Sequence, residues 1–175
     1  MPDTAVSKNG LSVVMHRTFD APVSALWACW TSGKHMAQWW GPHGMRATAD
    51  LDPRPGGAFS LIMHGADGTD YPLQGRYLDV VVGKLLVMQM HLDDHPASWH
   101  DYLSLQFTRA GGDEDTLPSL TVMTKVTFET AGTGTRLTVE QIYTSLAERD
   151  AFEAMGNTGG WSQSFDKLDK LLGEM

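Results

Sequence analysis

Three histidines and three aspartates lie within one short stretch, HLDDHPASWHD, at residues 91–101. Imidazole titrates near neutral pH and carboxylates can orient it, so this stretch could do acid–base chemistry or bind a metal. The His-x3-His spacing of His91 and His95 suits a metal on a helix, whereas here the chain leaves a predicted strand and meets Pro96. We therefore expect no metal site. His95 and His100 are candidate catalytic residues, and the alternative interpretation is a solvated or capping loop.

Motifs for nucleotide and serine chemistry are missing from the sequence. The segment GNTGG at 156–160 lies inside a helical pattern and lacks the Lys-Ser/Thr pair of a phosphate-binding loop. A Gly-x-Ser-x-Gly nucleophile turn is also missing. We therefore expect a protein that works without a cofactor.

Two adjacent tryptophans, Trp39 and Trp40, stand directly before Gly41 and Pro42 in HMAQWWGPHG. Ser32 can cap a short helix whose apolar side includes both indoles, and the Gly-Pro pair ends that helix. The indoles are therefore expected to fill the core or to wall a ligand cavity. Stacking on nucleic acid bases would require a basic groove, which the surrounding sequence lacks.

The composition limits the partners that the chain can have. Its 175 residues fit one domain, 1–175, and carry 21 acidic against 13 basic residues, a formal charge of -8. This charge repels phosphate backbones and anionic lipid, so we expect neither nucleic acid nor a membrane as partner. Apolar runs are far shorter than the ~20 residues of a membrane span. The start MPDTAVSKNG lacks a secretion signal and the single Cys29 suits packing, so we predict a cytoplasmic location.

The order of predicted elements indicates an α+β fold. A strand at 11–19 leads into two short helices, of which Asp20 can cap the first. Turn signals divide the following segment into antiparallel strands, and a glycine-bearing turn joins two further strands at 120–129 and 135–144. A long helical pattern at 146–172 ends the chain. This order predicts a curved antiparallel sheet wrapped around the C-terminal helix.

Three sequence elements, Trp-Trp-Gly-Pro, Pro-Gly-Gly and Met-Gly…Gly-Trp, occur in this order within residues 11–172. With them the chain resembles the START-like (SRPBCC, helix-grip) superfamily, in the branch named for homologues of the heat-shock chaperone ATPase activator. The resemblance implies a seven-strand-type antiparallel sheet that grips the C-terminal helix, with an apolar cavity between them. Because the superfamily includes ligand carriers, polyketide cyclases and hydrolases, the fold alone does not decide the function.

Polar side chains on the predicted inner face of the sheet are candidate ligand contacts. Leu137, Val139, Gln141 and Tyr143 alternate along one strand and therefore share a face. Gln141 and Tyr143 either contact a ligand or lie at a sheet edge, bonded to solvent or to the backbone.

Three glycines interrupt the C-terminal helical pattern in AMGNTGGW, residues 154–161. On a helical wheel, Met155 and Gly159 lie nearly opposite the apolar residues that follow them. The helix must therefore kink or break among these glycines, or be buried over a wide arc. We expect the missing side chains at this point to leave ligand space beneath the paired tryptophans.

A segment at about 93–119 departs from simpler members of the branch that the chain resembles. Within it, DYLSLQFT alternates Leu103, Leu105 and Phe107 with polar residues, which predicts a half-buried strand before a polar, acidic loop. We expect this insertion, with Trp99, at the rim of the cavity, where it would decide which ligand fits.

Three functions are consistent with these residues. We predict binding of a small hydrophobic or aromatic molecule in the internal cavity. The first alternative is a cofactor-free enzyme, cyclase-like or hydrolase-like, that uses His95, His100 or Tyr143 as acid or base. The second is a domain that interacts with a chaperone ATPase, which only the name of the branch suggests. A homodimer is left open. The candidate ligand contacts are Trp39, Trp40, Trp99, Gln141, Tyr143, Met155 and Gly159.

Overall fold

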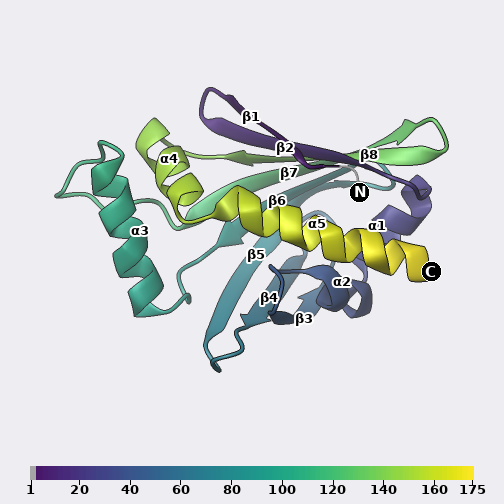
Figure 1. Cartoon of the computed structure of the whole chain (residues 1–175), viewed down its shortest axis with the longest axis horizontal. Coiled ribbons are helices and arrows are strands. Elements are labelled where there is room, and N and C mark those ends of the chain that lie inside the picture. The colour runs from purple at the N-terminus through teal and green to yellow at the C-terminus, as the bar shows by residue number, and fades with distance from the viewer. Residues whose placement is uncertain (1–2) are drawn as a thin grey trace.

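The computed structural model describes residues 3–175 and shows an α+β fold built on an eight-stranded sheet (Figure 1). Every neighbouring pair of strands is antiparallel. The sheet is curved and unclosed, and its order is β1-β2-β8-β7-β6-β5-β4-β3. The strands are β1 (Ala5–Asn9), β2 (Ser12–Phe19), β3 (Arg46–Leu51), β4 (Ala58–His64), β5 (Asp70–Val81), β6 (Leu85–His91), β7 (Thr121–Ala131) and β8 (Gly134–Ile142).

The helices follow the predicted order, and α3 (Ala97–Arg109) is an additional helix that was not predicted. They are α1 (Val23–Thr31), α2 (Gly33–Trp39), α3 (Ala97–Arg109), α4 (Leu146–Ala154) and α5 (Asn157–Glu174). Helix α5, yellow in Figure 1, runs along the sheet, and α1 and α2 pack against it. This arrangement confirms the predicted helix-grip fold. The N-terminal strand β1 was not predicted, and it brings the sheet to eight strands where the resemblance implies seven. Within residues 3–175, no helix is long and apolar enough to span a membrane.

The segment between β2 and β3 shows how local sequence sets the two short helices. The hydroxyl of Ser32 accepts from the backbone N–H of His35 at 3.4 Å and caps α2, as predicted. Asp20 does not cap α1, because that helix begins only after Pro22, which makes no side-chain cap bond. At the other end, Gly41 has φ +95 and takes the left-handed exit that glycine accepts at little cost.

The predicted strand within residues 101–108 is wrong, because this segment is part of helix α3. Pro96 is the N-cap of α3, and Leu103 and Phe107 are buried at i and i+4. Leu105, between them, is 45% exposed. A spacing of four residues fits both a strand face and a helix face, so only the exposure of Leu105 separates the two interpretations.

The C-terminal helical pattern breaks, which is one of the two predicted outcomes. Helix α4 ends at Ala154, and α5 begins at Asn157 after Gly156, whose φ of +85 is left-handed. Each helix then buries its own apolar face, with Phe152 on α4 and Trp161 on α5. The conflict on the helical wheel disappears because the two faces belong to two helices.

The core lies between the inner face of the sheet and helices α1, α2 and α5. Trp30 and Trp39 are fully buried there, with ring centroids 4.8 Å apart. The Trp39 indole N–H donates to the carbonyl of Cys29 at 3.0 Å, so its polar atom is paired inside the core. Trp30 also stacks on Trp161 of α5, at 6.1 Å and 14° between ring planes. These aromatic contacts fix the short helices against the end of the molecule that holds the cavity.

Candidate ligand-binding cavity

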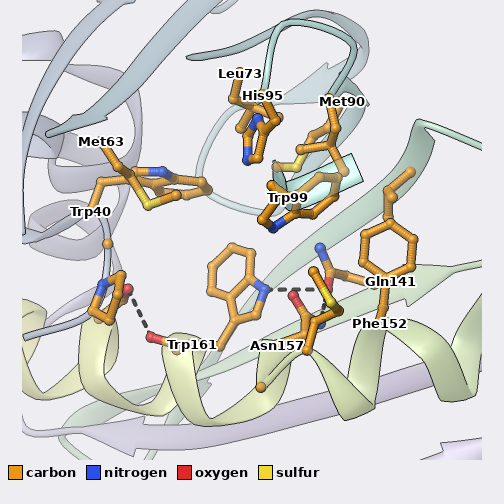
Figure 2. A pocket seen from close by; sticks show the side chains of 18 residues that line it. Trp40, Met63, Leu73, Met90, His95, Trp99, Gln141, Phe152, Asn157 and Trp161 are labelled. Atoms are coloured by element: carbon orange, nitrogen blue, oxygen red, sulfur yellow. Dashed lines mark hydrogen bonds between the residues drawn. The ribbon is translucent and has the colours of Figure 1, made fainter. Parts of the chain in front are cut away.

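A cavity of about 200 Å³ opens between the inner face of the sheet and the break between α4 and α5 (Figure 2). Its walls are mainly aromatic rings and thioethers contributed by six different elements and their flanks. These side chains are Trp40, Met63, Met90, Trp99, Phe152, Met155 and Trp161. Aromatic rings and flexible thioethers form an apolar surface that adapts to flat molecules.

Long-range packing assembles this wall. Trp40 follows α2, Met63 lies on β4 and Met90 on β6, while Trp99 comes from α3. The rings of Trp40 and Trp161 meet edge to face at 5.1 Å, and Trp99 and Phe152 meet at 6.1 Å. The α4–α5 break contributes backbone instead of side chains, because Gly156 and Gly160 line the cavity. A Cβ built on Gly160 would have no heavy atom within 4 Å, so open space lies beside it.

One wall is held by a hydrogen-bond network around Gln141 on β8. Its amide oxygen accepts from Asn157 Nδ2 at 2.6 Å, from Trp161 Nε1 at 3.2 Å and from the Tyr143 hydroxyl at 3.3 Å. Its amide nitrogen donates to Thr124 Oγ1 at 3.4 Å. Gln141 is only 5% exposed, so its polar atoms are satisfied inside the protein and fix the Trp161 ring.

The opposite wall presents His95, which lies between β6 and α3. Its Nδ1 donates to the carbonyl of Pro72 at 2.8 Å, because a backbone carbonyl can only accept. In the neutral ring this bond leaves Nε2 as the acceptor. The ring lies beside Trp99, with centroids 4.5 Å apart, and Figure 2 shows it pointing into the cavity. Within residues 3–175, no hydrogen-bond partner meets Nε2.

The environment keeps the His95 ring neutral. Burial lowers the pKa of His95 below its ordinary value, and the nearby His100 lowers it further. The bond to Pro72 and the charge of Asp94 act in the opposite direction without overcoming the effect of burial. At neutral pH the cavity therefore contains a hydrogen-bond acceptor at Nε2, and not a cation.

The other predicted catalytic candidates lie outside the cavity lining. The His100 Nε2 donates to the carbonyl of Leu92 at 3.0 Å, and the ring contacts Trp99 with centroids 5.6 Å apart. The Tyr143 hydroxyl is paired with Gln141 and Asn157 behind the wall, and burial raises its pKa above the ordinary tyrosine value. Over the described chain, no three His, Cys, Asp or Glu side chains are grouped to hold a metal ion.

The predicted ligand contacts divide into two groups. Trp40, Trp99, Gln141 and Met155 line the cavity. Trp39 lies in the core instead, because adjacent residues at the end of α2 point in different directions. Tyr143 is also outside the lining, because its hydroxyl is bonded to Gln141 and Asn157. Gly159 is on the exposed side of α5, and its neighbour Gly160 takes the position that was expected for it.

Several lining residues were missed at the sequence level, among them Met63, Met90, Phe152, Asn157 and Trp161. Two of them carried a usable signal. Met63 shares an alternating face with the buried Phe59 and Leu61, as Met90 does with the buried Leu86 and Met88 of β6. Asn157 gave none, because its role depends on the exact start of α5.

Comparison with known proteins decides the family. The sequence profile of the family described as "Activator of Hsp90 ATPase homolog 1-like protein" matches residues 20–173. The chain belongs to this family. A search of curated proteins found no match.

Solved structures share the fold of this activator-homologue-like chain. A Mycobacterium smegmatis protein is 25% identical, with a TM-score of 0.76 and 99% of each chain covered. An Arthrobacter aurescens protein is 22% identical, with a TM-score of 0.78 over 98% of this chain and 92% of that one. A Nitrosomonas europaea protein is 21% identical, with a TM-score of 0.75 over 96% of this chain and 97% of that one. Such distant likeness supports the fold and leaves the ligand to be argued from the cavity itself.

Proposed function

We propose that this activator-homologue-like chain binds a small, largely apolar molecule in the cavity beside the α4–α5 break. The observation that carries the proposal is the open space of about 200 Å³ within aromatic and thioether walls. Protein interiors are close-packed, so an apolar opening of this size is unusual unless something fills it. The family name refers to activation of the Hsp90 ATPase, whereas the cavity is what supports our proposal for this chain.

The size of the cavity limits the ligand. Sites for drug-sized molecules span roughly 300–1,000 Å³, and an apolar cavity of roughly 150 Å³ holds benzene. A space of about 200 Å³ therefore suits one or two fused rings. The Trp40 and Trp161 rings meet at 82°, so a ring ligand can stack on one indole while its edge meets the other, and an aromatic molecule is favoured over a branched aliphatic one.

Two measurements test this function. Mass spectrometry of an organic extract of the purified protein should find a stoichiometric apolar molecule of this size. Naphthalene-type probes added to ligand-free protein should quench tryptophan fluorescence, because three tryptophans line the site. Absence of any bound molecule and of any probe response would contradict the proposal.

A cofactor-free enzyme is the second candidate function, and the free Nε2 of His95 in the cavity supports it. A neutral imidazole with a lowered pKa can take a proton from a bound substrate. His100 and Tyr143 would not share this role, because each is bonded elsewhere. Incubating the extracted molecule with fresh protein distinguishes the candidates, since an enzyme converts it and a binding protein returns it unchanged.

A further inference from the structure

We propose that the cavity selects a neutral aromatic alcohol, whose hydroxyl donates to Nε2 of His95 and accepts from the indole nitrogen of Trp99. This inference rests on the proposed binding function and names the chemical class of the ligand.

His95 is held in a fixed orientation. Its Nδ1 is bonded to Pro72, and its ring is packed between Trp99 and Tyr71, with centroid distances of 4.5 and 5.6 Å. The residue is 8% exposed, and its ring points into the cavity. Nε2 accepts no hydrogen bond from residues 3–175, and a ligand hydroxyl entering the cavity can supply that donor.

The neighbouring Trp99 presents a hydrogen-bond donor to the same space. Trp99 Nε1 makes no hydrogen bond within residues 3–175, and Figure 2 shows this nitrogen turned toward the same space as the His95 ring. An indole N–H can only donate. A hydroxyl both donates and accepts, so one such group can satisfy both residues at once. An ether oxygen can serve only Trp99, and a methyl group serves neither.

Most other polar atoms of the cavity lining are already paired within the protein. Gln141 already accepts three hydrogen bonds and donates one, and Asn157 Nδ2 donates to Gln141 and Tyr143. Ser164 donates to the carbonyl of Gly160. Asn157 Oδ1 accepts no hydrogen bond from residues 3–175, so the Asn157 side of the cavity offers a hydroxyl an acceptor alone, whereas the His95 side offers an acceptor and a donor together.

The charge of the lining residues also limits the ligand. Among the described residues that line the cavity, none is Asp, Glu, Lys or Arg. Burying a carboxylate or an ammonium group without a partner is strongly unfavourable, so a charged ligand does not suit this site. A neutral alcohol can donate a hydrogen bond to Nε2 of His95 without bringing a net charge into the cavity. The aromatic walls then favour a ring system as its carrier.

Matched probes test the proposal. Calorimetry would compare 2-naphthol, which donates and accepts, with 2-methoxynaphthalene, which only accepts, on the intact wild-type protein. We expect about tenfold tighter binding of the naphthol, the size of one buried hydrogen bond. In His95→Asn the amide nitrogen can keep the bond to Pro72 while the Nε2 acceptor is lost. The naphthol and the ether should then bind this variant with about equal affinity. His91→Asn is the control, because His91 bonds to Thr121 outside the cavity lining.

Each outcome decides the question. Equal affinity of both probes for the wild type, or an unchanged preference in His95→Asn, would overturn the proposed ligand class while leaving the binding function intact. Failure of both probes to bind the wild type would overturn the binding function as well. A second measurement avoids variants altogether. The ¹⁵N resonance of His95 Nε2 should shift on addition of 2-naphthol and stay in place with the ether, and the absence of a naphthol-specific shift would contradict the proposal.

Discussion

The amide oxygen of Gln141 accepts the indole N–H of Trp161 at 3.2 Å, and this bond ties strand β8 to helix α5 at the wall of the cavity. The same oxygen also accepts from Asn157 and Tyr143. A single buried side chain thus positions one aromatic wall and the first turn of α5. The shape of the cavity depends on this bond as well as on apolar packing.

Replacing Gln141 by leucine should destabilise the protein by about 2–4 kcal/mol, because buried donors on Trp161, Asn157 and Tyr143 lose their acceptor. Equilibrium unfolding in urea measures the change. Gln38→Leu is the control, since Gln38 is exposed and bonds only to Lys34 of its own helix, and it should change stability by less than about 0.5 kcal/mol. Equal effects of the two changes would show that the Gln141 network contributes no stability.

Two glycines near the α4–α5 break should respond to alanine in opposite directions. Gly156 has φ +85, which strains a residue with a Cβ, so Gly156→Ala should cost about 1–2 kcal/mol. Gly159 lies on the exposed side of α5 with open space around it, so Gly159→Ala should stabilise the helix by about 0.5–1 kcal/mol. Thermal unfolding of both variants checks the signs. A neutral Gly156→Ala would mean that the left-handed turn is not needed for the break.

The buried His95 should make stability depend on pH. Its pKa is lowered in the folded protein, so the unfolded chain takes up the proton first as the pH falls through about 6.5. Stability is therefore fully present above that pH and decreases below it, down to the lowered pKa of the folded state. Urea unfolding at about pH 7.5 and about pH 5.5 should show this loss, and His95→Asn should reduce it. An unchanged pH dependence in the variant would remove His95 as its cause.

The fold was predictable because its signals are local and repeated. Alternating strands, turn glycines and the Ser32 cap each agree with the final sheet and helices. The error in α3 arose where two periodicities coincide, since Leu103 and Phe107 are spaced for a strand and for a helix alike. The long-range contact between His95 and Pro72, 23 residues apart, gave no local signal at all.

The site was only partly predictable, for geometric reasons. Gly159 was placed by extending one continuous helix through the break, whereas α5 starts anew at Asn157 and brings Gly160 to the cavity. Trp39 and Trp40 have the same chemistry and adjacent positions, so only the folded structure separates core from cavity. The cytoplasmic location stays a prediction, and the homodimer stays open.

The most direct test of the ligand cavity compares leucine at two neighbouring positions of α5. Gly160 borders the open space and Gly159 faces outward, and both gain similarly in helix propensity when replaced. The affinity of a naphthalene probe, measured by quenching of tryptophan fluorescence, should fall more than about tenfold in Gly160→Leu, because the side chain fills the cavity. The same affinity should be kept in Gly159→Leu. Wild-type affinity in Gly160→Leu would contradict the account, because the probe would then bind somewhere other than this cavity.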